Sequence, residues 1–258
     1  MSKKKYSFFY LFDVLFLNKI KILFLRNKNS FVVRQCSLIF VLLILLFASC
    51  KQDTPVYNQG IVYYEVTYPK LPPDHFMMSF LPKEMILKFK DGKYISELST
   101  GMGVFKTTFI INNQEQTYYQ TLKIINKKYY SKLDKKGVNK MLKKLPVYRI
   151  APTQSDSVTH IATFPVKAYR VTCPTDTFLI YATDSIKVNK PYWATQYKSI
   201  NGFLLQYRLE NYGITMELKA KKIEWTEVDD TDFVVPADYK EISQDEMDKE
   251  MIEIFSNF

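Results

Sequence analysis

The side chains that could do acid–base or nucleophilic chemistry are few in this chain of 258 residues. His160, one of only two histidines, follows Asp156 and Ser157 closely enough to suggest a hydrolase triad. The serine of such a triad often sits in a G-x-S-x-G turn, and the sequence contains no such turn. His160 is therefore expected to be a solvated loop residue. We predict no catalytic residues and a protein that is not an enzyme.

Metal and thiol chemistry have equally little support. The run Asp229-Asp230-Thr231-Asp232 resembles the first half of a calcium-binding loop, but the Gly and the bidentate Glu that follow in such a loop are missing. An acidic surface turn is expected instead. Cys173 precedes a proline at the end of a predicted strand, where a small buried residue is expected rather than a reactive thiol. The sequence predicts no metal site and no cofactor.

Cys50 is the residue whose surroundings predict a chemical modification. Eleven unbroken apolar residues from Leu38 to Ala48 have the length of a signal-peptide core and are too short to cross a ~30 Å hydrocarbon layer comfortably. The ending Phe47-Ala48-Ser49-Cys50 resembles the lipobox of bacterial lipoproteins, in which the thiol receives a diacylglyceryl group and a peptidase cuts before it. We expect cleavage between Ser49 and Cys50 and anchoring by the acyl chains on Cys50. The alternative is an ordinary secretory signal with an incidental cysteine.

Residues 1–49 are accordingly assigned to a signal peptide. With residues 1–33 included, the segment is longer than a signal peptide usually is. Either the translation start is placed too far upstream, or residues 1–33 form an additional membrane-surface helix. Residues 1–49 carry eight Lys and Arg against one Asp, whereas residues 51–258 carry 28 against 25 acids. Removal of the signal takes away most of the net charge of +10 and, with it, the electrostatic argument for nucleic acid. We predict a membrane contact through the anchor and no nucleic-acid partner.

The residues after the anchor point to a location. Lys51-Gln52-Asp53 resembles the short Lys-plus-acid signals that direct lipoproteins of Bacteroidota to the outer-membrane surface. We expect the outer membrane rather than the inner one, with periplasm-facing and surface-facing orientations both open. Residues 50–59 form a polar tether. Protein partners and oligomeric state have no signature in the sequence.

Strands are predicted along most of the chain after residue 60, where β-branched and aromatic residues recur. Asp91-Gly92, Asn112-Asn113 and Asn211-Tyr212-Gly213 each separate two such runs, as hairpin turns do. Connections this short leave no room for βαβ crossovers, so the sheet is expected to be antiparallel. The predicted strands are 61–68, 85–90, 93–98, 105–111, 116–125, 128–133, 168–173, 178–182, 202–210 and 214–223.

Two helices are predicted. Residues 135–145 place apolar side chains on one stripe and lysines on the other side. Ser243-Gln244-Asp245-Glu246 is a capping box that begins a helix over 243–255. No repeat or internal boundary interrupts the chain, so residues 60–258 are predicted to be a single mainly β domain. The stripe of the first helix consists of Val138, Met141, Leu142 and Leu145.

The chain is similar to the LolA-like lipoproteins of unknown function found in Bacteroidota. Val166-Lys167-Ala168-Tyr169-Arg170 stands where that family begins a strand, and Asn201 to Tyr207 stands where it leads into another. A strand ending at Ile223 follows, and Phe233-Val234-Val235-Pro236-Ala237-Asp238-Tyr239 matches the closing F-x-x-P-x-x-Y motif. The resemblance implies a curved antiparallel sheet forming a half β-barrel of LolA–LolB type, with helices on its concave side. It also implies a concave surface that binds the acyl chains of lipids or lipoproteins.

Five residues are predicted to line that surface. Strands whose two faces are both largely apolar suit a half barrel, and the runs 61–66 and 203–207 have this pattern. Alternation is expected to put Leu204 and Leu205 on opposite faces of their strand. The predicted ligand-binding residues are Leu204, Leu205, Tyr207, Tyr64 and Val66.

Two functions follow from the sequence. The first is a non-enzymatic lipoprotein that binds lipid or lipoprotein acyl chains, which predicts an apolar cavity of at least ~300 Å³ between sheet and helices. The second is an accessory or scaffold lipoprotein of an envelope complex, which predicts a packed concave face and a large surface patch of a single charge sign. Charge is segregated along the chain: 120–149 has ten basic residues and one acid, and 224–258 has twelve acids and two lysines. The basic stretch is expected to be a patch facing lipid headgroups or a solvated face of an amphipathic helix.

Overall fold

The structure is a computed structural model that describes residues 58–100, 104–153, 159–186 and 192–256. The chain divides into two units, Met1–Pro55 and Val56–Phe258, and all described residues belong to the second unit. The predicted signal peptide, its cleavage site at Ser49 and the lipidated Cys50 lie outside the described residues. Residues 50–57 of the predicted tether also lie outside them.

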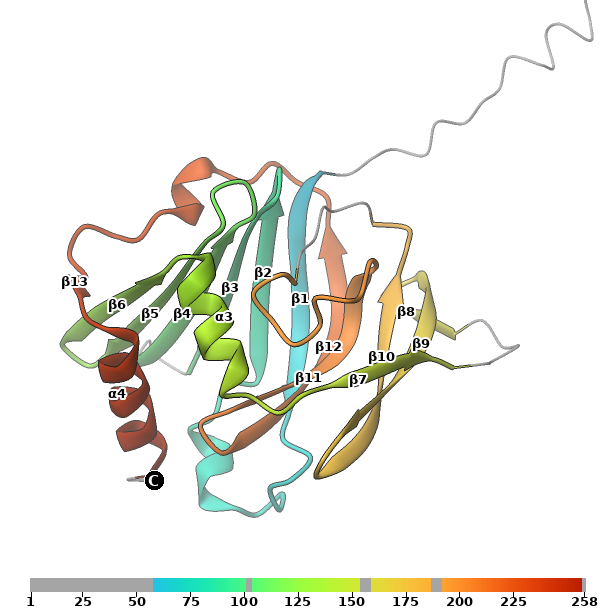
Figure 1. The fold of residues 1–258 in the computed structure, drawn as a ribbon, viewed down its shortest axis with the longest axis horizontal. Coiled ribbons are helices and arrows are strands. Elements are labelled where there is room, and N and C mark those ends of the chain that lie inside the picture. Colours follow the sequence, from blue (N-terminus) through green and yellow to red (C-terminus); the bar gives the residue numbers. More distant parts are fainter. Residues whose placement is uncertain (1–57, 101–103, 154–158, 187–191, 257–258) are drawn as a thin grey trace, which may run out of the picture. The chain divides into compact units, whose positions relative to one another are not determined.

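A sheet of 13 strands dominates the described part of the chain (Figure 1). Its order is β13-β6-β5-β4-β3-β2-β1-β12-β11-β10-β9-β7, and β8 pairs separately with β9. All pairs are antiparallel except the short β13–β6 pair, and β13 and β7 end the order without pairing to each other. The strands are β1 (Gln59–Thr67), β2 (Glu84–Lys90), β3 (Lys93–Ser99), β4 (Phe105–Asn112), β5 (Thr117–Ile124), β6 (Lys127–Leu133), β7 (Arg149–Pro152), β8 (Thr159–Ile161), β9 (Phe164–Cys173), β10 (Asp176–Thr183), β11 (Phe203–Asn211), β12 (Ile214–Glu224) and β13 (Lys240–Glu241).

The predicted class, a mainly β chain built on an open, largely antiparallel sheet with few helices, is confirmed. The three predicted hairpins are present as β2–β3, β4–β5 and β11–β12. Asp91 and Gly92 have φ of 47° and 83°, and Tyr212 and Gly213 have φ of 52° and 78°. Two consecutive positive φ angles define the turn whose twist matches that of the flanking strands, which is why these sequences form tight hairpins.

The two predicted helices are present within two residues of their expected ends, as α3 (Lys135–Lys143) and α4 (Gln244–Ser256). The capping box of α4 forms as expected: Glu246 N–H donates to Ser243 Oγ at 3.2 Å, and Ser243 N–H donates to Glu246 Oε2 at 2.8 Å. Asp134 caps α3 by accepting from Gly137 N–H at 2.8 Å. None of the helices among the described residues is long and apolar enough to cross a membrane.

Several short elements were not predicted. The strands β7, β8 and β13 have two to four residues, and two 3-10 helices occupy η1 (Phe76–Ser79) and η3 (Asp230–Phe233). β13 consists of two residues held by parallel pairing to β6. Elements of two to four residues are too short to show a hydrophobic periodicity in the sequence. They form because a neighbouring strand or a capping side chain holds them.

The two faces of the sheet are covered differently. We call the face that carries α3, α4 and the segment 192–200 the inner face (Figure 1). The segment 233–239 crosses the opposite side of β4–β6, which we call the outer face. Alternation in β1 buries Val62, Tyr64 and Val66 on the inner face and leaves the outer residues half-buried or exposed. The outer face of β1 is therefore less buried than a run of apolar residues implies.

Candidate functional site

An apolar cavity of about 370 Å³ lies between the inner face and its helices. β2, β3, β4, β5 and β11 form one wall, and α3, α4 and the segment 194–197 form the other. Its volume is within the range of small-molecule sites, which are mostly apolar with a few placed polar groups. The sheet lines it with Met85, Leu87, Tyr94, Ser96, Phe109, Ile111, Tyr118, Gln120, Phe203, Tyr207 and Leu209.

The helices contribute apolar side chains to the other wall. In α3, Val138 is fully buried, whereas Met141 and Leu142 of the predicted stripe face the cavity. In α4, Met247 and Met251 of the predicted stripe pack into a second hydrophobic cluster, and Ile252, which was not part of the prediction, reaches the cavity while staying half exposed.

A hydrogen-bonded cluster fastens α4 to the sheet at one side of the cavity. Gln244 Nε2 donates to Gln120 Oε1 at 3.1 Å and to Asp248 Oδ1 at 2.9 Å. Tyr212 Oη donates to Asp248 Oδ1 at 3.1 Å, and Ser131 Oγ donates to Gln244 Oε1 at 2.8 Å. Burial, partly offset by the hydrogen bond from Gln120, raises the pKa of Tyr212 and keeps its hydroxyl protonated. The cluster satisfies its own polar atoms, as buried networks must.

The five predicted ligand-binding residues are all buried. Of these, Tyr207 lines the cavity. Tyr64 lies beside it, with ring centroids 5.7 Å apart in an edge-to-face arrangement. Val66, Leu204 and Leu205 belong to the same hydrophobic cluster but are not among the cavity-lining residues.

A bulge changes the local geometry of β11. β10 pairs Ala182 with Leu204 and then Tyr181 with Gln206, so that Leu205 is skipped. The simple alternation expected for Leu204 and Leu205 is interrupted there, and both side chains are fully buried.

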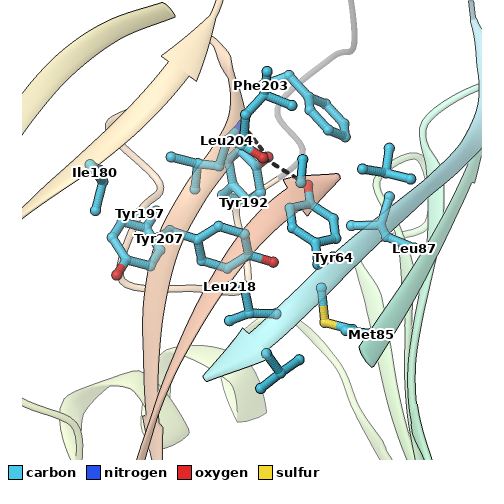
Figure 2. Close-up of a cluster of buried hydrophobic side chains, with 14 of the residues drawn as sticks. Tyr64, Met85, Leu87, Ile180, Tyr192, Tyr197, Phe203, Leu204, Tyr207 and Leu218 are labelled. Atoms are coloured by element: carbon cyan, nitrogen blue, oxygen red, sulfur yellow. Dashed lines mark hydrogen bonds between the residues drawn. The ribbon is translucent and has the colours of Figure 1, made fainter. Parts of the chain in front are cut away.

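Two tyrosine hydroxyls form hydrogen bonds with the backbone of Leu204, next to the bulge. The Leu204 N–H donates to Tyr192 Oη at 2.7 Å, and Tyr64 Oη donates to the Leu204 carbonyl at 2.7 Å (Figure 2). Buried backbone groups need such partners when strand pairing does not supply them.

The cavity residues on β3–β5 were missed by the sequence reasoning. Tyr94, Phe109 and Tyr118 lie on strands that were predicted correctly, and each has the inward parity of its strand. That parity is not readable from 105–111, where Phe109, Ile110 and Ile111 stand in a row and residues of both faces are buried. What the sequence lacks is the curvature that brings these strands opposite β11.

Three ion pairs join the two oppositely charged stretches. Lys144 pairs with Asp245 at 3.1 Å, and Lys127 pairs with Glu250 at 3.0 Å. Lys128 is bonded to Asp238. The basic stretch of β6 and α3 therefore meets the acidic C-terminal stretch, and these charges are shared across the contact between them.

The other sequence candidates lie away from the cavity. His160 is exposed on β8, and Asp156 and Ser157 lie outside the described residues. Cys173 is buried, and its thiol lies 3.4 Å from the Asp176 carbonyl. Within the described ranges, no three His, Cys, Asp or Glu side chains gather closely enough to hold a metal ion.

The acidic run 229–232 forms η3 and binds lysines of the outer face. Asp230 accepts from Lys90 Nζ and from Lys93 Nζ at 2.9 Å each, and Asp232 accepts from Lys88 Nζ at 2.6 Å. The hydrogen bonds from the two lysines lower the pKa of Asp230 to about 2. The turn therefore connects β2 and β3 to the segment that follows η3.

A second hollow, of about 460 Å³, lies on the outer face beneath the segment 233–239. Charged side chains such as Lys93, Glu115 and Asp230 share its lining with apolar ones. Its larger volume does not make it the better candidate for an apolar ligand, because its lining is polar in large part.

Comparisons with known proteins add a likeness of fold. No protein-family model matches the chain, and no curated protein matches it. Among solved structures, it is similar to PNGF-II in space group C2, with a TM-score of 0.48 and 16% identity over 76% of this chain and 32% of that one. PNGF-II in space group P21 gives a TM-score of 0.49 at 16% identity, over 76% and 33%. The chain thus spans about a third of the length of these structures.

Proposed function

We propose that the mature chain is a non-enzymatic lipoprotein of LolA–LolB type that binds lipid or lipoprotein acyl chains in the inner-face cavity. The observation that carries this proposal is the apolar cavity of about 370 Å³ between sheet and helices. Its volume and lining are those expected for the first of the two functions. An acyl chain placed there gains about 0.8 kcal/mol for each methylene removed from water.

The proposed location follows from the anchor. Lipidation of Cys50 would hold the chain on a membrane, and we propose the outer membrane because of the Lys51-Gln52-Asp53 signal. A ligand-binding domain tethered in this way would meet lipids at the membrane to which it is attached.

The alternative function, an accessory scaffold of an envelope complex, has less support. It expects a packed inner face and a large patch of one charge sign. The inner face holds a cavity, and the basic and acidic stretches pair through Lys127, Lys144 and their acidic partners. These observations favour ligand binding.

The form of the chain that begins at Lys51 is suited to testing lipid binding. Both hydrophobic clusters of the described residues are built from Val62 onward, so this form keeps its core. Purified from cells and analysed by native mass spectrometry and lipid extraction, it is expected to carry a bound lipid.

Two variants make this test specific to the cavity. Ser96→Trp puts a large ring into the cavity and is expected to abolish lipid retention. Glu97→Trp makes the same change one residue further, on the outer face, and is expected to retain lipid. Absence of lipid from the unsubstituted form, or equal retention by both variants, would contradict the proposal.

A further inference from the structure

The buried tyrosines of the inner face and its margin fall into two groups. In the first group the hydroxyl is already bonded: that of Tyr94 to the Asn113 side chain, and those of four others to the backbone. Tyr197 Oη donates to the Arg208 carbonyl at 2.5 Å, and Tyr68 Oη donates to the Pro82 carbonyl at 2.6 Å. At the β11 bulge, Tyr64 Oη donates to the Leu204 carbonyl, and Tyr192 Oη accepts from the Leu204 N–H. These four hydroxyls are used by the fold.

Tyr118 and Tyr207 form the second group. Both line the cavity, and their exposed fractions are only 7% and 6%. Within the described part of the chain, neither hydroxyl makes a hydrogen bond. In Figure 2 the Tyr207 ring lies beside Tyr64 and Tyr192 and shares none of their bonds. A hydroxyl that a bound ligand shields from water without giving it a partner costs about 1–3 kcal/mol, so a ligand in this cavity is expected to supply an acceptor.

Both hydroxyls are donors at neutral pH. Burial raises the pKa of Tyr207, and burial reinforced by Tyr212 and Asp248 raises the pKa of Tyr118. The nearby polar cluster around Gln244 satisfies itself and offers no acceptor that the structure assigns to either tyrosine. Each of the two hydroxyls therefore faces the cavity and can donate a hydrogen bond to a ligand.

The two donors come from strands of the same wall that are far apart in the sheet. Tyr118 is on β5 and Tyr207 is on β11, six strands apart in the sheet order, and the curvature of the sheet brings them to one cavity. A volume of about 370 Å³ is near the lower end of the range of ligand sites, which suits a lipid that inserts a single acyl chain.

We propose that the ligand is a single-chain lipid that carries an acceptor oxygen, an ester or acid carbonyl, into the cavity, where Tyr207 and Tyr118 donate hydrogen bonds to it. The inference rests on the proposed function and deepens it: the cavity selects an oxygenated chain over a plain hydrocarbon of equal length. Apolar lining supplies affinity, and the two hydroxyls supply selectivity, because a bare chain leaves them unpartnered.

The probes for the test are methyl dodecanoate and n-tetradecane, which have equal numbers of chain atoms. Each is titrated into the delipidated form that begins at Lys51, and displacement of an anilinonaphthalene sulfonate dye is measured. One net hydrogen bond changes affinity about fivefold, so two bonds are expected to make the unsubstituted protein prefer the ester by about 25-fold. Tyr207→Phe and Tyr118→Phe are each expected to remove about fivefold of that preference.

Tyr197→Phe is the matched control. It removes the same atom from a tyrosine whose hydroxyl is already bonded to the Arg208 carbonyl, so the ratio of the two affinities should stay that of the unsubstituted protein. Equal preference for both probes, or an unchanged ratio in Tyr207→Phe and Tyr118→Phe, would overturn the inference and leave lipid binding intact. Failure of both probes to bind the unsubstituted protein would overturn the proposed function as well.

Discussion

The inner face of the sheet is packed in two different ways along its length. Around Leu204 the segment 192–200 lies directly on β11, and Tyr64 and Tyr192 bind the backbone there. We call this the filled region. Over β2–β5, the helices α3 and α4 stand against the sheet and leave the space of the candidate site, which we call the cavity region.

The difference teaches how one residue type serves two purposes. In the filled region a bulge exposes backbone groups, and tyrosine hydroxyls substitute for the missing strand partner. β4 and β5 pair without a break in register, so no backbone group there needs the hydroxyl of Tyr118 as a partner. Tyr64 and Tyr192 are thus structural at the bulge, whereas Tyr118, on a strand that pairs without a break, keeps its hydroxyl available to a ligand.

The largest expected effect compares one leucine from each region. Leu204→Asn buries an amide in the fully enclosed core of the filled region and is expected to cost about 3–5 kcal/mol in the free energy of unfolding. Leu142→Asn changes a half-buried side chain at the cavity wall and is expected to cost below about 1 kcal/mol. Urea unfolding measures both. Equal losses would mean that the cavity wall is packed like the rest of the core.

A second pair of substitutions tests the hairpin turns, which both regions contain. Gly92 lies in the β2–β3 turn and Gly213 in the β11–β12 turn, with φ of 83° and 78°. Valine resists such angles, so Gly92→Val and Gly213→Val are each expected to cost about 1–3 kcal/mol, whatever packs nearby. Thermal unfolding of the two variants should show similar losses. A loss below about 0.5 kcal/mol in either would mean that its turn is not formed.

The elements of the fold were predictable because they rest on local signals. The turn at Asp91-Gly92 and the capping box at Ser243 specify their structures within a few residues. The bulge at Leu205 was not predictable, since it depends on how β10, β11 and β12 pair and on where Tyr64 and Tyr192 reach.

The site was predictable only in part for the same reason. Tyr207 was selected from the apolar run 203–207, and it lines the cavity. Tyr118 lies about ninety positions earlier in a correctly predicted strand, and nothing local connects it with β11. Residues on distant strands share a cavity only through the curvature of the sheet, which a single sequence does not specify.

A smaller effect is expected at the helix caps of the cavity region. Ser243→Ala removes the acceptor of the Glu246 N–H at the start of α4, and Asp134→Ala removes that of the Gly137 N–H at the start of α3. Each is expected to cost about 1 kcal/mol of stability. Because both helices stand over a cavity, they have less packing to compensate. Urea unfolding that shows no loss for either variant would mean that packing alone fixes the helices.

The smallest expected effect concerns pH and the outer side of the cavity region. Asp230 joins Lys90 of β2 to Lys93 of β3, and these bonds lower its pKa from 3.8 to about 2. A carboxyl whose pKa is lowered by folding stabilises the folded chain above its ordinary pKa, and this contribution is lost as the pH falls from about 4 to about 2.

Asp230→Asn should therefore flatten the fall in melting temperature between pH 5 and pH 2 relative to the unsubstituted protein. The carboxylate is largely exposed, so the difference should be small and should shrink further in 1 M salt, which screens exposed charges. Parallel melting curves for the two proteins at low salt would mean that η3 is not held by these lysines. The cavity region would then depend on its turns and caps alone, and the contrast with the packed core around Leu204 would be sharper still.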